Sequence, residues 1–296
     1  MAYTSGRYHL TNLLQDAYSN LGQYASYPLT GTPSKTSAPV GELAAKDSVK
    51  EGTLFCVETT DNEAPEGEYR RITAYAKSST AGTFTVADFS ATLTAADTIA
   101  VVNDLYPIYT MESLANRAMS KLGDIVIVDT TTLDSASNKT EYALEIAAKR
   151  KLLRVDYQTN TADANDNRWY TLFDVETIPA NPGVAGLLIL EQLDADRDIR
   201  YWYMDVHPRL NTYDDFIDEV INPQLASLAL TVAALEWQKA RLEDEETTQL
   251  LNYYREEFRI AKQELPIQRP PRKSRFITMP RKEKGTYTGV PGLVRL

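Results

Sequence analysis

The chain has 296 residues, of which 43% are hydrophobic and 24% charged, with a formal net charge of −10. This composition is ordinary for a soluble protein, and the length allows more than one folding module. A single cysteine, Cys56, excludes an internal disulfide and a cysteine zinc site. No apolar run approaches the roughly 20 residues that span a bilayer, and the first ten residues lack a signal-peptide pattern, so we expect an intracellular chain without a membrane partner.

The first predicted element is an amphipathic helix over residues 8–24, where Leu10, Leu14 and Leu21 recur at helical spacing and Gly22 is a stop signal. The stretch "YPLTGTPSKTSAPVG" that follows is rich in Pro, Ser, Thr and Gly and predicts a linker. Four short strand patterns then predict a small antiparallel module. They lie at 53–59, 69–76, 82–88 and 98–103.

A second helix is expected over 110–123, with Thr110 as its cap and Gly123 at its end. Five strand patterns follow and predict a larger β module. They lie at 142–148, 152–159, 169–178, 186–193 and 199–206. In the last pattern Ile199, Tyr201 and Tyr203 share one face by strand alternation, which leaves Arg200 and Trp202 on the other.

Three helices are predicted near the end of the chain. "YDDFIDEVI" (213–221) reads as a short acidic helix, and Asn222 with Pro223 begins a second one that is apolar almost all round. The last helix ends before Pro266. The residues expected to pack within the bundle or between subunits are Leu225, Leu228, Val232, Trp237, Leu251, Tyr254 and Phe258.

Together these elements predict an α+β fold, in which a helical bundle carries two antiparallel β excursions and an extended C-terminal arm. The bundle would combine the N-terminal, middle and three C-terminal helices. The predicted parts are an N-terminal bundle helix (1–30), a small β module (43–105), a bundle helix (107–124), a larger β module (139–207), the C-terminal helices (211–265) and the arm (266–296).

The arm is the most unusual stretch of the sequence. Residues 267–296 hold eight basic residues and one acidic one, so they carry +7 and leave −17 on the remainder. A basic, proline-broken segment without apolar clusters is expected to order on a partner, with "RFITM" adding as a strand to a sheet edge; the alternative is a solubilising tail. The binding residues predicted here are Arg269, Arg272, Lys273, Arg275, Phe276, Ile277, Arg281, Lys282 and Lys284.

Motifs for catalysis or cofactor binding are missing from the sequence. The two histidines, His9 and His207, have no nucleophile motif to serve, and there is no phosphate loop or dinucleotide fingerprint. "DANDNRWYTLFD" (163–174) resembles a calcium loop, but Arg168 replaces the required Gly and Asp174 the usual Glu, which favours a polar hairpin. We therefore expect no enzyme activity, no cofactor and no metal site.

Residues 199–277 run as a strand, an "HPRL" turn, an acidic segment, an Ala-rich helix, a Tyr-rich amphipathic helix and a basic tail. This order resembles the head-completion adaptor proteins, or head–tail connectors, of long-tailed bacteriophages. Residues 43–103 also resemble inserts in phage neck proteins. The resemblance implies a structural virion protein in the neck, made in the host cytoplasm. It also implies a homo-oligomeric ring, commonly of twelve copies, that docks under the portal protein and above a stopper or tail-terminator protein.

In such a ring, DNA would pass through the lumen without sequence-specific binding, and an acidic lining would let it slide. Three other interpretations stay open. The chain could be another neck or tail component, such as the stopper or the tail terminator itself. It could be a nucleic-acid-binding module that uses the basic tail, although that tail has few aromatic residues. A carboxylate-based virion hydrolase is the third, but no residue constellation supports it.

Overall fold

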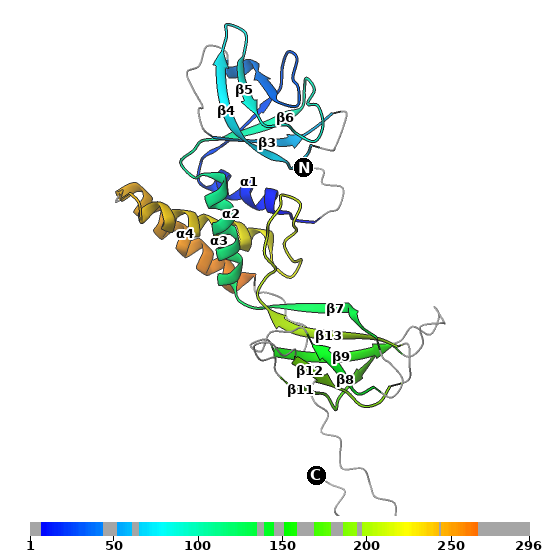
Figure 1. Cartoon of the computed structure of the whole chain (residues 1–296). Coiled ribbons are helices and arrows are strands. Elements are labelled where there is room, and N and C mark those ends of the chain that lie inside the picture. Colours follow the sequence, from blue (N-terminus) through cyan, green and yellow to red (C-terminus); the bar gives the residue numbers. More distant parts are fainter. Residues whose placement is uncertain are drawn as a thin grey trace, which may run out of the picture.

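The computed structural model describes residues 7–43, 52–60, 65–134, 139–144, 151–158, 169–178, 186–193, 197–242 and 244–265. Within these ranges the protein is mostly β-structure, with 13 strands in three antiparallel sheets and four α-helices. The helices lie between two β regions (Figure 1). The predicted helical bundle with three C-terminal helices is therefore wrong.

The helices are α1 (Leu10–Asn20), α2 (Ile108–Leu122), α3 (Pro223–Lys239) and α4 (Glu245–Glu264), with a short 3₁₀ helix at Gly41–Leu43. The strands of the first β region are β1 (Tyr24–Pro28), β2 (Ser37–Val40), β3 (Thr53–Glu58), β4 (Tyr69–Lys77), β5 (Gly82–Val86) and β6 (Thr98–Val102). Those of the second are β7 (Ile125–Asp134), β8 (Glu141–Leu144), β9 (Lys151–Gln158), β10 (Trp169–Leu172), β11 (Glu176–Ile178), β12 (Gly186–Ile189) and β13 (Asp198–Asp205).

The first β region is a six-stranded sheet in the order β1-β6-β3-β4-β5-β2. Strands β3 to β6 confirm the four predicted strands, but the stretch predicted as a linker contributes the end of β1 and all of β2. These two are the edge strands of the sheet, where proline is tolerated because one row of amides needs no partner. Pro28 and Pro39 made the segment look like a linker, and both fit on an edge.

The four helices pack around α3, which contacts α1, α2 and α4. The start of α3 was predicted correctly, because the Asn222 side chain accepts a hydrogen bond from the Gln224 amide at 2.9 Å and Pro223 occupies the first turn. Helix α4 begins in the same way at Asp244, whose carboxylate accepts from the amides of the next turn.

The predicted helix at 213–221 does not form, and local hydrogen bonds explain why. The Asp215 carboxylate accepts from the amides of Asn211 and Thr212, and the Asp218 carboxylate accepts from the Val220 amide. Short Asp side chains that bond nearby amides in this way compete with helix formation. The segment also pairs with the N-terminal stretch through a β-bridge between His9 and Phe216. Among the residues that the structure describes, two helices therefore follow the second β region, not three.

The second β region contains a four-stranded sheet, β10-β9-β13-β7, and a three-stranded sheet, β11-β12-β8. The single strand predicted at 169–178 is divided into β10 and β11, one in each sheet, and β7 was not predicted at all. A shared core of Tyr142, Val155, Leu188, Ile199 and Tyr201 is buried. The predicted alternation along β13 is confirmed, because Ile199 and Tyr201 are buried while Arg200 and Trp202 stay partly exposed.

Candidate assembly surfaces

Helix α3 obtains its cover from its own chain. Its residues 225–231 and 233–235 are buried, and together they lie on all sides of the helix. Cross-helix hydrogen bonds accompany this packing: the Asn20 amide of α1 donates to the Thr231 hydroxyl at 3.1 Å, and the Tyr254 hydroxyl of α4 donates to the Asn20 carbonyl at 2.6 Å. The apolar surface of α3 is therefore buried by contacts within one copy.

The seven residues that were predicted to pack within the bundle or between subunits lie on α3 and α4. Leu225, Leu228 and Leu251 are buried. Val232, Trp237, Tyr254 and Phe258 are partly buried, and the last three pack against the core that the four helices share. In the part of the chain that the structure describes, these side chains make contacts inside one copy. Their contacts with a second copy stay a prediction.

The end of the α3–α4 hairpin exposes large apolar side chains. This hairpin tip (239–242 and 244–253) carries Leu242, which is 50% exposed, Leu250 at 41% and Tyr253 at 58%. They were not predicted from the sequence, because the apolar stripe predicted for this helix covers only the side that faces α3. Leu250 and Tyr253 lie three residues apart, so they form a second stripe on the outer side of the helix.

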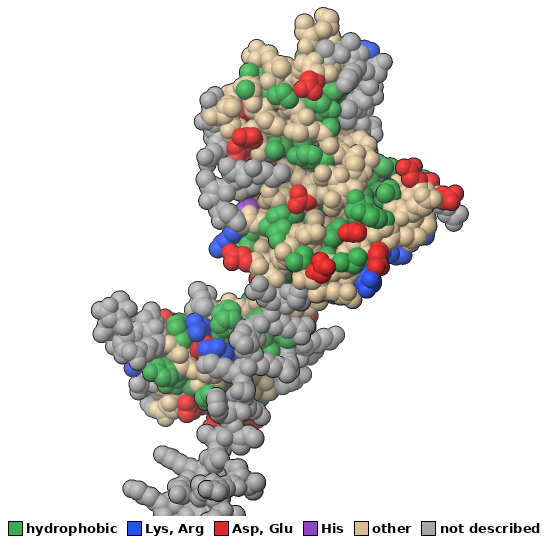
Figure 2. Space-filling model, turned by 180° about the vertical axis from the view of Figure 1, so that it is seen from behind, with side chains coloured by type: hydrophobic (Ala, Val, Ile, Leu, Met, Phe, Trp, Pro, Cys, Tyr) green, Lys and Arg blue, Asp and Glu red, His purple; other side chains and the backbone are tan. Residues whose placement is uncertain are grey.

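The hairpin tip is also acidic where α4 begins. Asp244, Glu245 and Glu246 are all exposed. The nearby Arg241 guanidinium lies 4.4 Å from the centre of the Trp237 ring, so it folds back onto α3. In Figure 2 the helical part extends into a protrusion that bears hydrophobic, acidic and basic side chains close together. Exposed apolar groups with charges around them are typical of protein interaction sites.

A cleft of about 380 Å³ lies between α2 and the chain that leaves β13. It is lined by Asn116, Arg117, Ser120, Asp205, Val206, His207, Pro208 and Arg209. Arg117 and Arg209 are exposed, and neither forms an ion pair with any residue that the structure describes. Val206 is 42% exposed. We call this site the arginine cleft.

Two polar side chains hold the wall of the arginine cleft in place. The Asn116 amide donates to the Leu210 carbonyl and its oxygen accepts from the Leu210 amide, both at 2.8 Å. His207 is buried; its Nε2 accepts from the Asp218 amide at 3.0 Å, and its Nδ1 lies 2.6 Å from the Pro208 carbonyl. His207 therefore anchors a turn. The loop that presents Arg209 is fixed before any partner binds.

An alternating array of arginine and tryptophan covers one face of the four-stranded sheet. The Arg200 guanidinium lies 4.2 Å from the centre of the Trp169 ring and 5.7 Å from that of Trp202, and Arg154 lies 5.7 Å from Trp202 on the neighbouring strand. Between the two arginines lies Asp156, a fully buried carboxylate.

Asp156 holds this array together. Its carboxylate accepts from Nε of Arg154 at 2.5 Å, from Nε of Arg200 at 2.9 Å and from the Thr171 hydroxyl at 2.9 Å. Burial alone would raise the pKa of this carboxyl, but the hydrogen bonds from the two arginines and Thr171 outweigh burial and hold the pKa below its usual range. The charges are therefore satisfied internally, which favours a stabilising role for the array.

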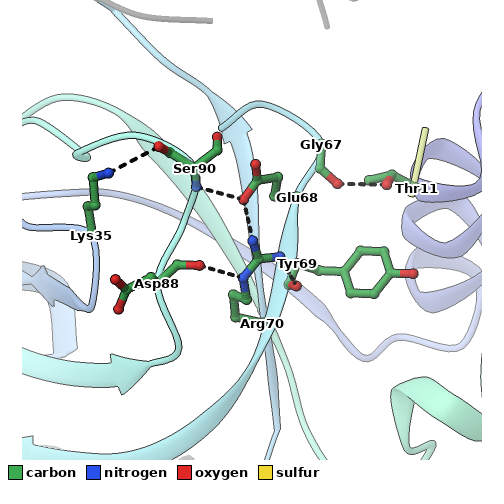
Figure 3. A network of polar contacts seen from close by, with 8 residues as sticks. All are labelled: Thr11, Lys35, Gly67, Glu68, Tyr69, Arg70, Asp88 and Ser90. Carbon is green, nitrogen blue, oxygen red and sulfur yellow. Dashed lines mark hydrogen bonds and ion pairs between the residues drawn. The ribbon is translucent and has the colours of Figure 1, made fainter. Parts of the chain in front are cut away.

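A second polar network joins the first β region to α1 (Figure 3). The Glu68 carboxylate, only 1% exposed, accepts from the Arg70 guanidinium at 2.6 Å and from the Ser90 amide at 3.1 Å. Next to it, the Thr11 hydroxyl of α1 donates to the Gly67 carbonyl at 2.7 Å. A buried ion pair beside a helix–sheet contact fixes the position of the sheet relative to the helix.

Metal binding and membrane insertion find no support in the described ranges. No group of three or more potential metal ligands occurs there, and no helix there is both long and apolar enough to cross a bilayer. Asp163, Asn165 and Asn167 of the calcium-like loop lie outside the described residues, whereas Asp174 is exposed. Cys56 is buried, which raises the pKa of its thiol and disfavours the reactive thiolate.

The predicted arm also lies outside the described residues. This holds for all nine of its candidate binding residues, Arg269, Arg272, Lys273, Arg275, Phe276, Ile277, Arg281, Lys282 and Lys284. No protein family and no curated protein matches the chain. The surfaces above therefore have to be interpreted from their own chemistry.

Proposed function

We propose that this chain is a structural protein of a bacteriophage neck. Copies of it would form a ring that docks under the portal protein and connects the head to the tail around the DNA channel. The ring would number twelve copies if it follows the adaptor family that residues 199–277 resemble. The stopper or the tail terminator would bind on its other side.

The observation that carries this proposal is the exposed outer side of the α3–α4 hairpin. Helix α3 is already covered within one copy, and yet Leu242, Leu250 and Tyr253 stay exposed at the hairpin tip. Exposed apolar side chains that lie close together beside charges are typical of interaction sites, and side-by-side packing of copies would bury these three. The resemblance and this surface lie on the same segment of the chain.

The charge distribution supports a role for the arm in docking. The arm carries +7 on a chain of −10, so the remaining parts of neighbouring copies repel one another at low ionic strength. An arm that reaches into an adjacent component would offset this repulsion. At roughly 3.3 Å per residue, thirty residues reach on the order of 100 Å at most, which suffices to cross a neighbouring subunit and contact the portal.

The proposal is tested in the phage that encodes the chain. Removal of the gene should yield DNA-filled or leaking heads and separate tails in electron micrographs. Deletion of residues 267–296 should give the same particles while the purified protein stays folded, because the described helices end before the arm. Heads and tails that join normally without the gene would contradict the proposed function.

The arm has a matched control within the chain. Reversing the charge of Arg272, Lys273 and Arg275 should weaken docking in a salt-dependent way. Reversing the same number of exposed charges on the described part, at Arg71 and Lys77 on β4 and Lys262 near the end of α4, should not. Full complementation by the arm-deleted protein would show that the arm is passive, even if the ring function stands.

A further inference from the structure

We infer that copies of this chain associate head to tail, with the hairpin tip of one copy bound in the arginine cleft of the next. The contact itself requires only self-association; that it closes into a ring around DNA rests on the proposed function. Neither site was visible in the sequence, and the residues that form them here belong to described parts of the fold.

The tip and the cleft of one copy cannot meet. The loop that forms the cleft wall leads into the N-terminal end of α3, whereas the hairpin tip follows its C-terminal end. In Figure 1 the α3–α4 turn points away from the loop that follows β13. An occupant of the cleft must therefore come from another molecule.

The two surfaces are complementary in charge. The tip presents Asp244, Glu245 and Glu246, all exposed. The cleft presents the guanidinium groups of Arg117 and Arg209, which have no acidic partner in the described part of the chain. Arginine is well suited to carboxylates because its planar fork can donate two parallel hydrogen bonds. Asp205 also lines the cleft, but its side chain is buried and accepts a hydrogen bond from the Val206 amide, so the two exposed arginines set the charge that the cleft offers to a partner.

Apolar groups lie beside the charges on both surfaces. Leu242 is 50% exposed at the tip, and Val206 is 42% exposed at the cleft. A cleft of about 380 Å³ holds on the order of ten waters, which a leucine side chain and its neighbours would displace. An apolar contact surrounded by charge pairs is the usual composition of a protein interface.

Helix capping explains only part of the tip. Acids at the start of α4 favour the helix dipole, and Asp244 caps the helix through the amides of Glu246 and Thr247. That role does not require Leu242 or Tyr253 to be exposed beside them. When the tip of each copy binds the cleft of a different neighbour, the contact is heterologous, and repeated contacts produce a closed ring or an open filament.

A charge exchange tests the contact directly. The tip variant carries Glu245→Arg and Glu246→Arg, and the cleft variant carries Arg117→Glu and Arg209→Glu. Each variant alone should associate at least tenfold more weakly than the unmodified protein, as measured by sedimentation velocity over a concentration series. An equimolar mixture of the two should associate again, because each then offers the other a complementary tip and cleft. A chain with all four substitutions should also associate.

The matched control reverses two exposed charges elsewhere, Glu264→Arg on α4 and Arg71→Glu on β4. It should associate like the unmodified protein. Circular dichroism melting of every variant separates lost association from lost folding, and recovery in the mixture cannot arise from unfolded chains.

Several outcomes would overturn the inference. It fails if the unmodified protein is monomeric at every concentration, if the single variants associate normally or if the mixture shows no recovery. It also fails if the cleft variant loses affinity for duplex DNA while its self-association is unchanged, because the two arginines then bind DNA phosphates and not a second copy. Loss of tailed particles on gene deletion, together with normal association of both variants, would leave the proposed function standing without this contact.

Discussion

Replacing Asp156 with Asn should destabilise the second β region while keeping its shape. The carboxylate is fully buried and accepts from Arg154, Arg200 and Thr171. An asparagine has one oxygen and one NH₂ group, so one of the two guanidinium groups would face a donor in place of an acceptor. The charge that offsets the two arginines would be lost as well.

The size of the loss follows from the burial of the partners. Removing one partner of a buried ion pair costs about 3–5 kcal/mol when the other charge stays buried. Here the Arg154 and Arg200 side chains are 29% and 23% exposed, so water can solvate part of each guanidinium. The lower end of this energy range therefore applies, and we expect Asp156→Asn to reduce the free energy of unfolding by about 3 kcal/mol at pH 7.

The effect should depend on pH with a definite sign. Because the pKa of the Asp156 carboxyl is lowered in the folded protein, its contribution is present above the unfolded pKa of about 3.9 and is lost as pH falls toward the folded value. The difference in stability between the unmodified protein and Asp156→Asn should therefore be constant from about pH 7 to pH 5 and should shrink below about pH 4.

Tryptophan fluorescence can follow this region selectively. The chain has three tryptophans, and Trp169 and Trp202 both lie in the arginine–tryptophan array. In a Trp237→Phe background, urea unfolding monitored by fluorescence reports on this sheet alone. Asp174→Asn, which changes an exposed carboxylate of the same region, is the control and should have an effect within about 0.5 kcal/mol. A loss below about 1 kcal/mol, or a difference that persists unchanged at pH 3, would refute the argument.

Three further predictions concern other parts of the molecule. Leu228→Asp places an unpaired charge in the helical core and should lower the free energy of unfolding by more than about 3 kcal/mol in thermal or urea unfolding. Val232→Asp should lower it by less, because that position is partly exposed. Equal losses for the two variants would mean that the packing around α3 is misassigned. Gly52→Ala should lower the free energy of unfolding by at least about 3 kcal/mol, because the added Cβ would lie 1.9 Å from the Val102 carbonyl oxygen. Gly22→Ala should lower it by about 1 kcal/mol, because its Cβ meets open space and only the φ of +66° is unfavourable. Calcium or a chelator should leave the melting temperature unchanged, and a rise with calcium would restore the loop at 163–174 as a metal site.

Local patterns predicted most individual elements. Local start and stop signals located α1, α2, α3 and α4, because a helix end is decided by a few neighbouring residues. The predicted cap of α2 was wrong: the helix begins at Ile108 with Pro107 in the cap position, and Thr110 lies inside its first turn. Strand β7 was missed because its run "IVIVDTTTLD" follows directly after a helix and contains no turn signal of its own. The interruption between β10 and β11 was missed for the opposite reason, since the run from Trp169 to Ile178 looks continuous in sequence and only the pairing partners divide it.

The fold class was wrong because it depended on how elements combine. The helical content was overestimated by the segment 213–221, and the β content was underestimated by treating two proline-containing edge strands as a linker. Neither surface proposed for self-association could be predicted, because each depends on which side of an element remains uncovered. The exposure of Leu250 and Tyr253 is decided by where α3 lies. That of Arg117 and Arg209 is decided by the loop after β13.

The failed helix at 213–221 is also what creates the arginine cleft. A helix there would use the Asp218 amide for its own hydrogen bonding, and the buried His207 ring would lose the donor that Nε2 now accepts from at 3.0 Å. Without that anchor the loop carrying Arg209 would no longer be fixed beside α2. The local hydrogen bonds of Asp215 and Asp218 and the anchoring of His207 therefore act together on this segment. The Asp-rich turns of 211–220 hold the wall of the arginine cleft in place.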